Sequence, residues 1–147
     1  MRRLAATIVD HGRPWLHVLI DEADNRILEC AVAARVKNTG DGLLMTFTTP
    51  SEAVACAAEL VRELRGVGLT VRAGLHAGEI VVREDGDVTG LAVNLAARVQ
   101  QAASGGATWV SSTVRDLLLG GEWSFTERGE HVLKGIDGAW RLYELAA

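Results

Sequence analysis

The chain has 147 residues, of which 48% are hydrophobic and 23% charged, and its formal net charge is −4. These values are typical of one soluble globular domain, and a negative chain without a dense basic run argues against a nucleic-acid or anionic-membrane partner. No apolar run approaches the length of a membrane span or of a signal peptide's hydrophobic region. We therefore expect a single cytoplasmic domain over residues 1–147, with Cys30 and Cys56 as buried thiols.

The first half of the chain predicts alternating strands and helices. Residues 4–9 form an apolar run that predicts a short strand, and apolar residues recur at helical spacing over residues 14–34. Two extended runs follow, joined by a turn that contains Asp41. A helix then begins near Pro50 and ends at Gly66.

The second half continues in the same way and predicts a mixed sheet. Its expected elements are strands over 69–75 and 78–83, an alanine-rich helix over 91–103, a strand over 107–110, a short helix over 111–120 and glycine-broken strands over 123–145. Helices that alternate with strands, together with hairpins too short for parallel crossovers, indicate a mixed α/β sheet with helices packed on one face.

The turn around Asp41 has glycine on both sides, in the run Gly40-Asp41-Gly42. Glycine suits a tight hairpin, where backbone φ becomes positive, and Asp-Gly turns are common in ordinary hairpins. A carboxylate between glycines also suits a metal–phosphate site, since the glycines let backbone and ligand approach closely. Both interpretations are open from these residues alone.

The helix over 91–103 carries two polar residues in an apolar setting. Asn94 and Arg98 are four residues apart, so they share a helix face that points either to solvent or into a site. An amide beside a guanidinium can orient a sugar hydroxyl and neutralise charge on a transferring phosphoryl group. Asp87 lies in the turn before this helix. Lys134 lies at a strand end before Gly135, where it is either solvated or able to meet a polyphosphate.

Four blocks of the sequence, in this order, resemble the catalytic domain of class III adenylate and guanylate cyclases: residues 36–42, 72–79, 90–99 and 128–135. The resemblance covers roughly residues 13 to 145, and the ordered combination is highly specific although each block alone is weak. It implies a ferredoxin-like mixed sheet with helices packed on one face. The implied reaction is attack of the ribose 3′-hydroxyl of ATP on the α-phosphate, which gives cyclic AMP and pyrophosphate.

The resemblance also assigns roles to the metal and base sites. Asp41 matches the family's second metal-binding aspartate, and two Mg²⁺ or Mn²⁺ ions would activate the hydroxyl and neutralise the leaving group. Lys37 and Asp87 match the pair that reads the adenine edge. A lysine and an aspartate at these positions imply ATP rather than GTP.

The remaining matches concern the sugar and the phosphates. Asn94 and Arg98 match residues that orient the ribose and stabilise the transition state, and Lys134 matches a polyphosphate-binding lysine. In the family, sites form at a head-to-tail dimer interface, with metal carboxylates from one chain and the other residues from its partner. The resemblance therefore implies a homodimer or a heterodimer with another cyclase domain.

The sequence departs from the family at its N-terminus. A strand motif like Phe-x-Asp-Ile, which carries the first metal aspartate, is absent, and the family's usual spacing would place that aspartate upstream of Met1. Either the chain begins inside the family's first helical segment, or residues 4–9 are a degraded first strand and Asp10 survives as a ligand. In both cases the domain is N-terminally shortened and the helix start that receives phosphates is missing.

Three functions follow from this mixture of retained and missing parts. The chain is an adenylate cyclase that tolerates a reduced metal site, with weak or no activity alone; or it is a non-catalytic homology module that dimerises or senses nucleotide; or it completes the site of a full-length cyclase. All the retained residues except Asp41 belong to base, ribose and phosphate recognition. This asymmetry between the two sides of the site favours the third function.

Overall fold

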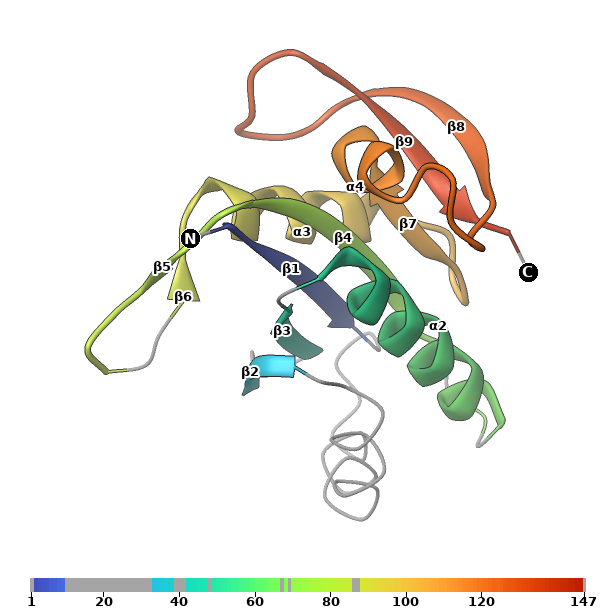
Figure 1. Cartoon of the computed structure of the whole chain (residues 1–147). Helices are drawn as coiled ribbons and strands as arrows, with labels where there is room; N and C mark the ends of the chain where they lie inside the picture. The colour runs from blue at the N-terminus through green and yellow to red at the C-terminus, as the bar shows by residue number, and fades with distance from the viewer. Residues whose placement is uncertain are drawn as a thin grey trace.

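The computed structural model describes residues 2–9, 33–38, 42–47, 49–66, 68, 70–85 and 88–146. Its elements are β1 (Arg2–Val9), β2 (Ala33–Asn38), β3 (Gly42–Phe47), α2 (Pro50–Gly66), β4 (Arg72–Glu79), β5 (Val81–Val82), β6 (Val88–Thr89), α3 (Leu91–Ala102), β7 (Thr108–Ser111), α4 (Ser112–Leu117), β8 (Phe125–Val132) and β9 (Ala139–Leu145). Figure 1 shows the β8–β9 hairpin at the top of the view, beyond α3 and α4.

Seven of the strands form one mixed sheet, in the order β2-β3-β1-β4-β7-β9-β8. Strands β4 and β7 pair in parallel, whereas the other neighbours in this sheet pair antiparallel. The first four positions, β2-β3-β1-β4, have the strand order of a ferredoxin-like core. The predicted fold class is therefore confirmed. Strands β5 and β6 form a separate two-stranded ribbon.

The N-terminal strand β1 lies inside this sheet, between β3 and β4. In its register Val9 is opposite Gly42 on one side and Arg72 on the other. Of the two interpretations of the N-terminus, the one that begins inside a helical segment is therefore wrong, because residues 4–9 belong to a central strand. Asp10 lies outside the described residues.

Two helices cover opposite faces of the sheet. Successive residues of a strand point to opposite faces, and Ala73 and Leu75 of β4 belong to the core under α2, whereas Gly74 between them faces Gln100 of α3. The α2 core consists of Met45, Phe47, Ala53, Val54, Cys56, Ala57, Leu60, Val61, Leu64, Val71, Ala73, Leu75, Val110, Val114 and Leu118. Helix α3 therefore packs on the face of β4 opposite to α2.

Helix α3 approaches β4 unusually closely. A Cβ atom built on Gly74 would lie 2.1 Å from the backbone nitrogen of Gln100, and one built on Gly78 would lie 3.0 Å from the Cβ of Ala92. Backbone meets backbone at the first position, so no side chain can move aside there. Glycine at position 74 is required for α3 to sit where it does.

We predict that Gly74→Ala lowers the free energy of unfolding by about 3 kcal/mol or more, the upper range for overpacking a core. Urea denaturation followed by circular dichroism measures the effect. Gly66→Ala is the matched control, because its added Cβ meets nothing within 4 Å and alanine gains up to about 1 kcal/mol in helices. Equal unfolding midpoints for Gly74→Ala and the wild type would contradict the close approach.

Candidate functional site

A second buried cluster joins α3 to the β8–β9 hairpin on the face opposite α2. It consists of Leu95, Val99, Ala103, Trp109, Leu133 and Leu142, with Ala102, Ala107, Ile136 and Trp140 packed against it. We call this set the hairpin cluster. The site residues predicted on α3 and on the hairpin are adjacent in sequence to members of this cluster.

Three predicted site residues adjoin the hairpin cluster in this way. Asn94 precedes buried Leu95 in α3, Arg98 precedes buried Val99, and Lys134 follows buried Leu133 in the turn of the hairpin. The buried neighbour fixes the backbone in each case and leaves the polar side chain outside the core. One packed cluster thus supports the backbone of Asn94 and Arg98 in α3 and of Lys134 in the hairpin turn, two parts of the chain that lie far apart in sequence.

The two polar residues of α3 differ in their surroundings. Asn94 is exposed, and Arg98 is half-buried and donates a hydrogen bond of 2.8 Å from Nη1 to Oε1 of Gln101. The helix begins after Gly90, whose φ of +130° suits glycine, and the Gly90 carbonyl accepts from the Asn94 backbone. Both side chains are therefore accessible from outside the core, and Arg98 has a neutral partner that another acceptor can replace.

Lys134 is exposed in the turn between β8 and β9. Within the described part of the chain its ammonium group forms no ion pair. A cation held at the end of a hairpin without a carboxylate partner is available to an anion. Among the described residues, therefore, no carboxylate competes with an anionic ligand for Lys134.

The other predicted residues lie at the limits of what the structure describes. Lys37 is in β2, where its backbone pairs with Leu44 of β3. Asp41 and Asp87 lie outside the described residues, so their placement and that of the predicted base-reading pair remain predictions. Among the described residues no group of three or more histidine, cysteine, aspartate or glutamate side chains could hold a metal ion.

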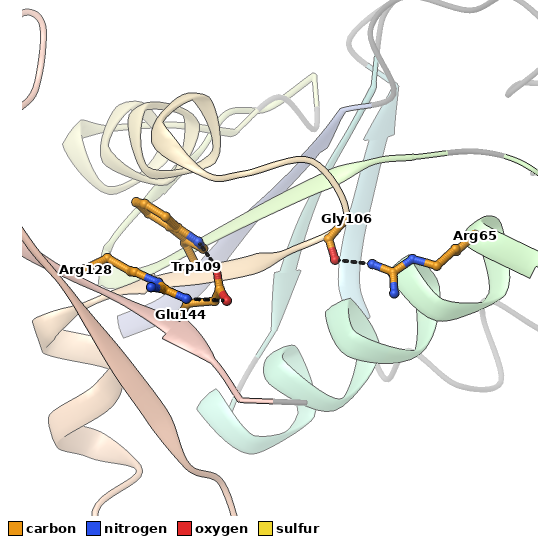
Figure 2. A network of polar contacts seen from close by, with 5 residues as sticks. All are labelled: Arg65, Gly106, Trp109, Arg128 and Glu144. Atoms are coloured by element: carbon orange, nitrogen blue, oxygen red, sulfur yellow. Dashed lines mark hydrogen bonds and ion pairs between the residues drawn. The ribbon is translucent and has the colours of Figure 1, made fainter.

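A polar network fastens the hairpin to β7 beside the cluster. Figure 2 shows Glu144 of β9 between its two partners: Trp109 donates from Nε1 at 2.8 Å, and Arg128 donates from Nη2 at 3.0 Å. Burial raises the pKa of Glu144, but the hydrogen bonds from Trp109 and Arg128 outweigh it and hold the pKa below its ordinary value. In the same view Arg65 of α2 donates to the Gly106 carbonyl at 2.6 Å.

His76, which is buried on the α3 face of β4, was not predicted as a site residue. Its Nδ1 lies 2.7 Å from the Ser111 hydroxyl, and its ring packs edge-on against Trp140 with centroids 5.9 Å apart. Burial lowers the pKa of His76 from its ordinary 6.5 to about 4, so the ring is neutral near pH 7. Strand alternation was the available signal, because it places His76 on the same face as Gly74 and Gly78.

Comparison with known families identifies the class of protein. Residues 16–147 match the model of the adenylate and guanylate cyclase catalytic domain. This match covers most of the chain. The chain therefore belongs to the adenylate and guanylate cyclase catalytic domain family, as its sequence blocks predicted.

Curated relatives and solved structures are consistent with this assignment. The chain is 33% identical to "Putative adenylate cyclase 3" of Rhizobium meliloti (strain 1021), over 92% of this chain and 27% of that protein. It is 36% identical to an uncharacterized protein of Mycobacterium tuberculosis, over 75% of this chain and 29% of that protein. The chain thus spans less than a third of the length of these two relatives.

Two solved structures illustrate the similarity of fold. The adenylate/guanylate cyclase/hydrolase from Silicibacter pomeroyi superposes with a TM-score of 0.78 at 28% identity, covering 100% of this chain and 98% of that one. The catalytic core of a rhodopsin-guanylyl cyclase with converted specificity, in complex with ATPalphaS, superposes with a TM-score of 0.84 at 19% identity, covering 100% of this chain and 97% of that one.

No described helix is both long enough and apolar enough to cross a membrane.

We predict that stability falls in weak acid because of His76. Its pKa is lower in the folded than in the unfolded chain, so from pH 6.5 down toward pH 4 the unfolded chain binds a proton that the folded chain does not. Its contribution is complete above pH 6.5 and decreases by about 2 kcal/mol between about pH 7 and about pH 5. Urea denaturation at the two pH values measures this change.

The control for this prediction is His76→Gln, which has no titratable group at this position. Its free energy of unfolding should not show the decrease between about pH 7 and about pH 5 that is due to His76. Glu144 contributes only in stronger acid, because its lowered pKa makes stability fall once the pH passes below its ordinary value of 4.5. Identical pH slopes for the wild type and His76→Gln would mean that His76 titrates normally in the folded protein.

Proposed function

We propose that this domain is an adenylate cyclase module, which supplies residues for the conversion of ATP to 3′,5′-cyclic AMP and pyrophosphate in intracellular signalling. The observation that carries the proposal is that Asn94, Arg98 and Lys134 adjoin members of one buried cluster although they come from two distant parts of the chain. Membership of the cyclase family and the similarity to the Rhizobium meliloti protein support it.

The residues of α3 act on the sugar and the α-phosphate. The Asn94 amide orients the ribose so that its 3′-hydroxyl faces the α-phosphorus, and the Arg98 guanidinium neutralises charge that grows on the phosphoryl oxygens. Arg98 bonds the neutral Gln101 amide oxygen. A phosphate oxygen offers a charge-assisted bond that is roughly twice as strong, so substrate can draw the guanidinium away from Gln101.

Lys134 and Lys37 bind the two ends of the nucleotide in this proposal. The Lys134 ammonium pairs with the polyphosphate, which leaves as pyrophosphate, and Lys37 with Asp87 reads the adenine edge. An aspartate accepts a hydrogen bond from the adenine 6-amino group, whereas guanine presents a carbonyl oxygen there. The pair therefore favours ATP over GTP.

The metal side of the site rests on Asp41, with Asp10 as the candidate second carboxylate. Asp10 directly follows Val9 of β1, and Asp41 directly precedes Gly42 of β3. Val9 and Gly42 are opposite one another in the register of these two strands. Carboxylate oxygens are the ligands that Mg²⁺ and Mn²⁺ prefer. A bound divalent ion would activate the 3′-hydroxyl and neutralise the leaving group.

Sharing of the site between two chains is the second part of the proposal. The three residues beside the hairpin cluster all belong to the ribose and phosphate side, whereas the sequence matches only one of the family's two metal aspartates, Asp41. This asymmetry suits a homodimer of low activity. It suits even better a heterodimer in which a full-length cyclase supplies the metal carboxylates, with this chain as a non-catalytic activator half.

We predict that the isolated protein turns over ATP far more slowly than about 1 s⁻¹, the low end of typical enzymes. The reason is the reduced metal side: loss of one ion at a phosphoryl-transfer centre removes several kcal/mol of charge stabilisation. An assay of cyclic AMP formed from ATP and Mn²⁺ measures the rate. Turnover at or above that value would show that the metal side is complete.

We predict further that the protein binds ATP more tightly than GTP, and that Asp87→Ala removes this preference. Titration calorimetry with each nucleotide tests both statements. Glu84→Ala is the matched control, because it removes a carboxylate from the same connection without touching the predicted base pair. Equal affinities of the wild type for the two nucleotides would mean that Lys37 and Asp87 do not read the base.

A further inference from the structure

Four aromatic rings connect the hairpin that carries Lys134 to strands β4 and β7 of the same sheet. His76 of β4 packs edge-on against Trp140 of β9, with centroids 5.9 Å apart and planes at 88°. Trp109 of β7 packs against His131 of β8, with centroids 5.7 Å apart and planes at 67°. His131 and Trp140 are themselves opposite one another in the β8–β9 register. We call these four residues the ring row.

Each ring pair spans a strand that lies between its two partners. In the sheet order β4-β7-β9-β8, the His76–Trp140 pair passes over β7, and the Trp109–His131 pair passes over β9. Ladder hydrogen bonds join only adjacent strands, so the ring row adds a connection that they lack. It interlocks the hairpin with β4 and β7 on the α3 face.

Polar contacts hold the inner ends of the row in place. The His76 ring is buried and hydrogen-bonded to the buried Ser111 hydroxyl, so its orientation is fixed from β7. At the other side, Trp140 Nε1 donates to the Asp137 carbonyl at 3.0 Å, inside the turn that contains Lys134. The row therefore reaches from the central strand β4 to the backbone of this turn.

We propose that the ring row sets the position of the Lys134 turn relative to α3, and that His76 and Trp140 are positioning residues for polyphosphate binding. This inference rests on the proposed function for the part that concerns nucleotide. The structural part stands separately: the row immobilises residues 131–140, whatever Lys134 binds. Aromatic pairs of this geometry contribute up to about tenfold in an equilibrium beyond their buried area, enough to control the opening of one turn.

Hydrogen exchange tests the structural part on the full chain. In Trp140→Leu, amides of residues 131–140 should exchange about tenfold faster, the upper range for loss of an aromatic pair, while those of α2 remain unchanged. Trp140→Phe keeps a ring against His76 and should restore most of the protection. If Trp140→Leu does not fold, His76→Asn serves, because it can still bond Ser111 but has no ring. Unchanged exchange in 131–140 would overturn the inference.

A double-mutant cycle on ATP affinity tests the positioning role. Trp140→Leu and Lys134→Ala should each weaken ATP binding, and the double variant should bind no more weakly than Lys134→Ala alone, because a misplaced turn costs nothing once Lys134 is gone. Leu64→Ala, in the core under α2, is the control whose effect should multiply with that of Lys134→Ala. Multiplied effects of Trp140→Leu and Lys134→Ala would overturn the positioning role.

The two measurements separate this inference from the proposed function. If the wild type binds no ATP, the proposed function fails, and the exchange of residues 131–140 still decides whether the row holds the turn. If the wild type binds ATP and the exchange is faster in Trp140→Leu but the affinity is unchanged, the row is only structural and the positioning role is refuted.

Discussion

The packing of α3 against the β8–β9 hairpin is the interaction on which the rest of the site depends. Leu95 and Val99 of the helix and Leu133 of the hairpin turn belong to the same buried cluster, so the helix and the turn share one hydrophobic core. Burial of each such side chain contributes about 1.5–3 kcal/mol relative to its exposure. The residues beside these three are Asn94, Arg98 and Lys134, and the hydrophobic effect thus places three polar groups that have no direct bond to one another.

The central strand β4 contacts α3, the hairpin and the core under α2. Gly74 lets α3 lie directly on the strand, His76 reaches toward the hairpin from the same face, and the opposite face of β4 forms the core under α2. One strand therefore carries the helix, the contact to the hairpin and the main core. In the proposed site, small distortions of β4 should therefore affect the ribose and phosphate sides together.

Much of the fold was predictable from the sequence because its signals are local. The strand predicted over 69–75, the alanine-rich helix over 91–103 and the apolar run over residues 4–9 each show their pattern within a single element. The placement of α3 on the face opposite α2 was not predictable in this way. It depends on the contact of Gly74 with Gln100, which are far apart in sequence, and a single element carries no signal of its partner's side.

For the candidate site, too, local sequence patterns and the family resemblance predicted some features and long-range contacts decided the others. The identities of Asn94, Arg98 and Lys134 came from the family resemblance, but their common support by the hairpin cluster appears only in three dimensions. His76 was missed because a single histidine in an alternating strand gives no sign of its partners Ser111 and Trp140, which come from two later strands. Long-range side-chain contacts of this kind are set by topology rather than by local pattern.

Complementation tests the central claim, that this chain supplies the ribose and phosphate side of a shared cyclase site, most directly. A full-length cyclase with alanine at its own asparagine and arginine positions keeps its metal aspartates and should be inactive alone. Mixed with this protein it should regain cyclic AMP synthesis, which Asn94→Ala or Arg98→Ala in this chain abolishes and Asp41→Ala leaves intact. If light scattering shows the heterodimer and activity does not return, the claim is contradicted.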